Sequence, residues 1–231
     1  MATLKTFFTL NIQNTGKYFS HIESVIIFCN RVVRYPKAGE VNPSMTLFVR
    51  NIIEDDNKKV VPPESVVNWG EYIYTVADWT RADVLSVTWM NRIQNKSVIS
   101  ECREAGDVWE CKAIYTQEQP SGWIEIAPPP TYSGDTFIQI LPSTQDSDNR
   151  NYKHIARLDP GQTEPVFLTR GNYVVTEILS WDTMAGLVYY MGTDTRRPGS
   201  RHLYVVPDTG DMDSQCITCD IKVDYYCGGI Y

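Results

Sequence analysis

The chain has 231 residues, of which 42% are hydrophobic and 12% aromatic, and it carries a formal net charge of -7. That length and apolar content are enough for one large domain, or two small ones, with a buried core. The excess of acidic residues and the lack of a Lys/Arg cluster argue against nucleic acid as a partner. The sequence has no run of roughly 18 apolar residues, so we predict no membrane-spanning segment in it.

The first 33 residues differ in pattern from the rest of the chain. Residues 1–12 hold one Lys and a broken apolar patch, which does not make a convincing signal peptide. Ser20 followed by Glu23 has the spacing of a capping box, and apolar residues then recur at helical spacing as far as Val33. We therefore predict a short amphipathic surface helix there, and a division of the chain into segments 1–33 and 34–231.

From residue 46 onward the apolar residues alternate with a period near two, and turn-forming Gly, Pro, Asp and Asn separate the runs. Short strands at roughly 8 to 16 residue spacing predict an all-β fold, and not alternating βαβ units. We expect about three sequential groups of four antiparallel strands, as in propeller blades or a sandwich. The groups are predicted at residues 45–117, 123–168 and 173–218.

Most of the aromatic residues fall on these alternating runs. They could form a carbohydrate-binding platform, but side chains on such runs more often fill the space between packed sheets. We therefore expect the core to contain Trp69, Trp79, Trp89, Trp109 and Trp123, with Tyr72, Tyr74, Tyr189, Tyr190 and Tyr204.

The sequence predicts no catalytic residue. Ser133 and Ser200 each neighbour one glycine but lack the G-x-S-x-G pattern of a nucleophile elbow. His154 and His202 lie beside apolar residues in strand-like runs, so we expect each to be structural. The acidic run at residues 54–56 precedes two lysines and predicts a solvated hairpin tip.

The chain has six cysteines. Cys102 and Cys111 flank the turn signal Gly106-Asp107, so a hairpin could bring their sulfurs to disulfide distance. The alternative is a pair of reduced core cysteines in a cytosolic protein. Cys216 and Cys219 form a C-x-x-C, but no second cysteine pair or histidine pair stands at zinc spacing, so we predict no metal site and no cofactor.

Residues 95–97, Asn-Lys-Ser, complete an N-glycosylation sequon. The sequon matters only if the chain enters the secretory pathway, where Asn95 would have to lie on an exposed turn. A disulfide between Cys102 and Cys111 would point to the same compartment.

Four stretches together resemble the β-propeller domain of the dipeptidyl peptidase IV family, over residues 34–219. They are YPKAGEVNP, WMNRIQNKSV with the spaced cysteines after it, TRGNYVVTEI continuing into LVYYMGTD, and PGSRHLYVV followed by CITC. The resemblance implies part of an eight-bladed propeller that covers an α/β-hydrolase domain. By this resemblance, the full-length family enzymes remove dipeptides after Pro or Ala. Their peptide substrates reach the serine of the hydrolase domain through openings that the propeller helps to form.

The resemblance also implies individual roles. It pairs Cys102 with Cys111 and Cys216 with Cys219, and it matches Asn95 to a glycosylated turn. It places the protein outside the cell, as a secreted or plasma-membrane ectodomain in an oxidising compartment. Cys29 and Cys227 are left without partners.

The chain departs from the family pattern in several places. The paired glutamates that bind the substrate amino terminus have no equivalent here. Residues 124–127, Ile-Glu-Ile-Ala, stand where the family often has an aromatic residue and an arginine, and a second cysteine pair near His154 and Thr163 is missing.

We therefore expect a propeller fragment without peptidase activity, whose uncovered blade faces cause aggregation. The alternatives are a non-enzymatic protein-interaction module from an inactive family member, and a gene fragment without function.

Overall fold

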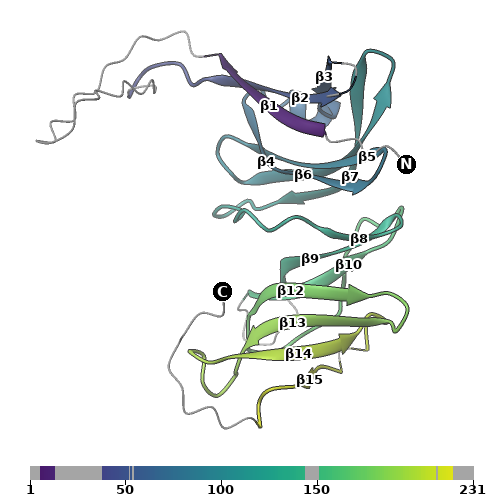
Figure 1. Cartoon of the computed structure of the whole chain (residues 1–231). Coiled ribbons are helices and arrows are strands. Elements are labelled where there is room, and N and C mark those ends of the chain that lie inside the picture. The colour runs from purple at the N-terminus through teal and green to yellow at the C-terminus, as the bar shows by residue number, and fades with distance from the viewer. Residues whose placement is uncertain are drawn as a thin grey trace, which may run out of the picture. The chain divides into compact units, whose positions relative to one another are not determined.

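The computed structural model describes residues 6–13, 38–51, 53, 55–143, 151–211 and 213–220. The chain divides into two compact units, Met1–Ile124 and Glu125–Tyr231, and both are built from β-strands (Figure 1). The helix predicted between residues 20 and 33 lies outside the described residues. Within the predicted segment 1–33, β1 (Thr6–Gln13) is a strand that pairs antiparallel with the strand beginning at Ser44.

The described part of the first unit contains one sheet and one short helix. Its remaining elements are β2 (Ser44–Asn51), β3 (Asp56–Val61), α1 (Glu64–Val67), β4 (Tyr72–Arg81), β5 (Val84–Asn91), β6 (Lys96–Ala105) and β7 (Val108–Glu118). The strand order is β1-β2-β3-β7-β6-β5-β4. β4 to β7 form an antiparallel meander of four strands, which is the expected blade pattern.

The predicted start of the first group at residue 45 is wrong, because the four-stranded meander begins at Tyr72. β2 and β3 form a hairpin of their own, and β3 joins the meander through a parallel pairing with β7. Pro62 and Pro63 follow β3 directly and, with α1, carry the chain away from it, so no hairpin links β3 to β4. At the tip of the β2–β3 hairpin, Asp55 and Asp56 are exposed, which confirms the solvated turn.

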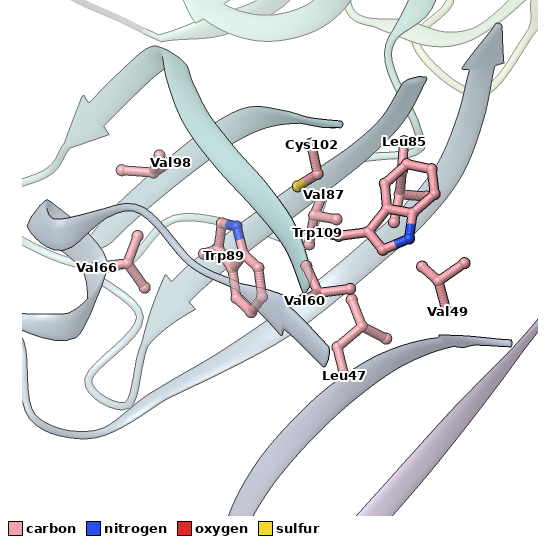
Figure 2. Packing of buried hydrophobic residues seen from close by; sticks show 10 residues of the cluster. All are labelled: Leu47, Val49, Val60, Val66, Leu85, Val87, Trp89, Val98, Cys102 and Trp109. Atoms are coloured by element: carbon pink, nitrogen blue, oxygen red, sulfur yellow. The ribbon is translucent and has the colours of Figure 1, made fainter. Parts of the chain in front are cut away.

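Buried residues from both halves of this sheet meet in one core. Leu47 and Val49 of β2 and Val66 of α1 pack with Trp89 of β5 and Trp109 of β7 (Figure 2). Since β2 and β5 belong to the same sheet, the sheet folds over so that β2, β3 and α1 cover one face of the meander. Burial of these apolar side chains stabilises the unit by roughly 1.5–3 kcal/mol for each large residue.

The second unit holds two antiparallel sheets of four strands. One consists of β8 (Thr131–Ser133), β9 (Thr136–Ser143), β10 (Tyr152–Leu158) and β11 (Val166–Phe167), and the other of β12 (Val175–Asp182), β13 (Leu187–Thr193), β14 (Arg201–Pro207) and β15 (Gln215–Cys216). These confirm the groups predicted at residues 123–168 and 173–218.

The two sheets of the second unit share a core. Ile138 and Ile155 from the first sheet pack with Val188, Tyr190 and Val206 from the other. This is the packing expected of consecutive blades, in which each sheet buries a face against its neighbour. No helix among the described residues has the length and apolar character needed to cross a membrane.

Candidate functional site

Cys102 and Cys111 are directly opposite one another on β6 and β7. The turn at Gly106, with a positive φ of 63°, lets the chain reverse between the two strands, so their Cα atoms come within 3.9 Å. The structure joins the two sulfurs in a disulfide. Cys102 is fully buried, with its sulfur 3.7 Å from Ser100 Oγ, so the bond ties the hairpin to the core of the first unit.

Asn95 lies in the turn between β5 and β6 and is half-buried. The Asn91 side chain closes this turn, because its Oδ1 accepts hydrogen bonds from the backbone N–H groups of Asn95 and Lys96, each at 3.0 Å. Asn91 Nδ2 also donates to Asn95 Oδ1 at 2.7 Å. Ser97, the third residue of the sequon, is buried near the start of β6. An enzyme that glycosylates Asn95 would therefore have to recognise the Ser97 hydroxyl before β6 forms.

His154 is a buried residue of β10, and both of its ring nitrogens are engaged. Nε2 donates to Gly171 O at 3.0 Å, so Nδ1 is the acceptor and takes a hydrogen bond from Thr169 Oγ1 at 3.1 Å. Thr169 Oγ1 accepts in turn from the backbone N–H of Ile155 at 3.0 Å. The prediction that this histidine is structural is confirmed.

The two serines considered for catalysis lie at or next to the connections of hairpins. Ser133 ends β8 and pairs with Thr136 at the start of β9. Ser200 precedes β14, and its backbone N–H donates to Arg197 O at 2.8 Å. Both positions differ from the strand-to-helix turn of a nucleophile elbow.

The core role predicted for the tryptophans is confirmed at four positions and wrong at one. Trp89 and Trp109 are 1% and 6% exposed, and Trp69 and Trp79 pack against the same core. Trp123 is 72% exposed. The reason is that β7 has already ended at Glu118, so the alternation of the strand no longer directs Trp123 toward the core.

Three tyrosines of the second unit form a stack beside the C-x-x-C. Tyr204 lies parallel to Tyr190 with ring centroids 5.3 Å apart, and parallel to Tyr173 at 6.1 Å. The hydroxyls of Tyr173 and Tyr190 are 3.0 Å apart. Burial raises the pKa of both Tyr190 and Tyr204, so these phenols stay protonated.

The structure also brings His202 to the C-x-x-C. Cys216 and Cys219 are joined in a disulfide, and one ring nitrogen of His202 lies within 4.8 Å of both sulfurs. The sequence alone does not predict this group, because the whole connection between β14 and β15 separates the histidine from the cysteines. The only local sequence pattern that indicates this group is the C-x-x-C. His202 joins the two cysteines through the pairing of β14 with β15.

The family model for the dipeptidyl peptidase IV N-terminal region matches residues 28–228. The chain is 30% identical to venom dipeptidyl peptidase 4 of Apis mellifera over 226 residues, which is 94% of this chain and 28% of the bee protein. It is 28% identical to dipeptidyl peptidase 4 of Bos taurus and 29% identical to inactive dipeptidyl peptidase 10 of Mus musculus. These alignments cover 83% and 80% of this chain but 26% and 24% of the relatives.

Solved structures show the same fold. The crystal structure of Porphyromonas gingivalis dipeptidyl peptidase 4 superposes with a TM-score of 0.63 at 20% identity, covering 91% of this chain and 28% of that one. The chain therefore spans about a quarter of the length of the relatives it matches. By the extent of the family match, it belongs to the dipeptidyl peptidase IV N-terminal region family.

Proposed function

We propose that the chain is a segment of the β-propeller of a dipeptidyl-peptidase-IV-like serine exopeptidase, where it helps to support the hydrolase domain and to control the access of peptides. The observation that carries this proposal is the family match over residues 28–228, together with the four-stranded antiparallel sheets. His154, a buried polar side chain of β10, has hydrogen bonds at both ring nitrogens within the second unit. A histidine used in this way for stability fits a supporting role of the chain.

In this proposal the 231-residue chain does not itself cleave peptides. A Ser-His-Asp hydrolase needs a nucleophile, a base and oxyanion donors in one place. We expect the purified chain to leave Gly-Pro and Ala-Pro chromogenic substrates intact. Hydrolysis that disappears in the Ser133→Ala or Ser200→Ala variant would refute this, whereas hydrolysis that both variants retain identifies a contaminating peptidase.

The proposal also places the protein in an oxidising extracellular compartment. Disulfides that close short loops are typical of such compartments, and Asn95 lies in the turn between β5 and β6. After secretion from an animal cell, non-reducing peptide mapping should show Cys102 linked to Cys111 and Cys216 linked to Cys219. Mapping should also show a glycan on Asn95. Secreted protein without this glycan would contradict the proposal that Asn95 is glycosylated.

A second candidate function is a non-enzymatic interaction module. It is favoured by residues 124–127, which replace the aromatic residue and arginine of the outer substrate pocket. In this stretch Ile126 is exposed, as is the preceding Trp123. The chain is also about as similar to inactive dipeptidyl peptidase 10 of Mus musculus as to dipeptidyl peptidase 4 of Bos taurus.

A serine-reactive fluorophosphonate probe separates the two candidates when it is applied to the natural protein that carries this sequence. Covalent labelling of that protein supports the exopeptidase. Folded natural protein that stays unlabelled, while bovine dipeptidyl peptidase 4 is labelled in parallel, supports the interaction module.

A further inference from the structure

The C-x-x-C and His202 form a cluster of potential metal ligands in the second unit. One ligand atom from each of His202, Cys216 and Cys219 lies within 4.8 Å of the other two. Strand geometry explains the cluster: residues i and i+2 share a face, so His202 and Tyr204 point the same way from β14, and Tyr204 pairs with Cys216 of β15.

Backbone and side-chain hydrogen bonds hold this arrangement in place. The backbone N–H of Leu203 donates to Thr218 Oγ1 at 3.0 Å, and the N–H of Ile217 donates to Leu203 O at 2.8 Å. The Thr218 hydroxyl also lies 3.4 Å from His202 Nδ1. A hydrogen-bonding partner on one ring nitrogen orients a ligand histidine, so Thr218 is suited to present the imidazole to the sulfurs.

The three side chains are ligands of the types that Zn²⁺ binds in proteins. Two thiolates and one imidazole suit Zn²⁺, which takes Cys S⁻ and His N in tetrahedral sites, and C-x-x-C is a common spacing for two of its ligands. Cys219 is exposed while Cys216 and His202 are half-buried, so a reductant and a metal ion can both approach. These residues supply three of the four ligands that Zn²⁺ takes in a tetrahedral site, and water can be the fourth ligand in sites with three protein ligands.

We propose that reduction of the Cys216–Cys219 disulfide creates a Zn²⁺ site made of His202, Cys216 and Cys219. The disulfide accepts two electrons and two protons from a dithiol, which is itself oxidised to a disulfide, and two thiols form. Binding of the metal then releases both thiol protons and leaves two coordinating thiolates. Disulfide and metal thus exclude each other at this position. The inference does not depend on the proposed function.

The test uses the full chain and Co²⁺ as a spectroscopic substitute for Zn²⁺. A trialkylphosphine reduces the disulfides under anaerobic conditions and becomes phosphine oxide with oxygen from water, without binding the metal as a dithiol would. We expect equimolar Co²⁺ to produce a thiolate-to-cobalt charge-transfer band and the visible bands of a tetrahedral site. Zn²⁺ should then remove these bands, and unreduced protein should not develop them.

Variants assign the ligands. Cys216→Ser and Cys219→Ser should each abolish the bands, whereas the matched control Cys102→Ser should keep them, since that cysteine is remote in sequence and buried in the other unit. His202→Gln should weaken Co²⁺ binding by at least about tenfold, the scale on which even outer-shell partners change metal affinity. His202→Cys should restore binding with a stronger charge-transfer band, which keeps the test valid if the glutamine variant folds poorly.

Three results would overturn the proposal. The first is reduced wild-type protein, shown by thiol titration to have a free Cys216 and Cys219, that develops no bands. The second is a Cys216→Ser, Cys219→Ser double variant that keeps the bands, which would assign the metal to other cysteines. The third is an affinity that neither replacement of His202 changes.

Discussion

Ser100 shows how a buried polar side chain is paired within a sheet of this protein. Its hydroxyl accepts a hydrogen bond from Trp89 Nε1 at 2.9 Å and donates one to Val87 O at 3.1 Å. Both Trp89 and Ser100 are almost completely buried. Without the hydroxyl, the indole N–H would be left in an apolar core without its acceptor, and an unsatisfied buried donor is costly.

We therefore expect Ser100→Ala to lower the free energy of unfolding by roughly 1–3 kcal/mol. Urea unfolding followed by tryptophan fluorescence measures the change. Ser121→Ala, in an exposed loop position, is the matched control and should have little effect. Equal effects of the two substitutions would contradict the role given to the Ser100 hydroxyl.

A second residue-scale prediction concerns Asp159 and pH. Its Oδ2 accepts from Arg157 Nη2 at 2.9 Å and Nε at 3.2 Å, and its Oδ1 accepts from Thr136 Oγ1 at 3.0 Å. The hydrogen bonds from Arg157 hold the pKa of this carboxyl below its usual value. The carboxylate thus stabilises the fold above the unfolded-state pKa of about 3.9, and this stabilisation disappears as pH falls through the lower folded-state pKa.

Asp159→Asn should therefore cost about 0.5–1.5 kcal/mol at neutral pH, and the difference from wild type should shrink below pH ~4. Urea unfolding at a series of pH values provides the measurement. Asp213→Asn, which changes an exposed carboxylate, serves as the control. A wild-type advantage that persists unchanged into strong acid would show that the charge of Asp159 is not its source.

At the scale of elements, short hairpins could be predicted from the sequence and long-range pairings could not. The sequence predicts the groups at residues 123–168 and 173–218 because each strand pairs with its neighbour in the chain, and the residues that connect the strands include Gly, Pro or Asp. The parallel pairing of β3 with β7 joins strands separated by three others, so no local pattern marks it. For the same reason, no local pattern predicts the approach of His202 to the C-x-x-C. Alternation does not mark where a strand ends, so it wrongly predicts a core position for Trp123.

The β6–β7 hairpin also carries a prediction about its disulfide. Cys102 and Cys111 are 9 residues apart, whereas Cys216 and Cys219 are 3 apart, and a longer closed loop removes more unfolded-state entropy. We expect Cys102→Ala with Cys111→Ala to lower the unfolding free energy by roughly 2–3 kcal/mol. Cys216→Ala with Cys219→Ala should cost less. The opposite order, measured by urea unfolding under oxidising conditions, would contradict this account of the hairpin.

At the scale of the whole molecule, the chain is a set of sheets that belongs to a longer family fold. It spans about a quarter of its relatives, and its own described residues supply sheets, hairpin turns and disulfides. The family assignment came from ordered stretches of sequence, whereas composition and periodicity alone predicted only an all-β protein. The role proposed for these sheets is to form part of the propeller of a dipeptidyl peptidase.

A chimera tests this role most directly. The segment of the Apis mellifera venom dipeptidyl peptidase 4 that aligns with this chain is replaced by residues 28–228, and the secreted protein is assayed on a Gly-Pro chromogenic substrate. A parallel chimera with the aligned segment of bovine dipeptidyl peptidase 4 controls for the effect of segment exchange. We predict that both chimeras are secreted and hydrolyse the substrate. A bovine chimera that is active beside a chimera of this chain that is secreted and monodisperse but inactive, or is not secreted at all, would contradict the account.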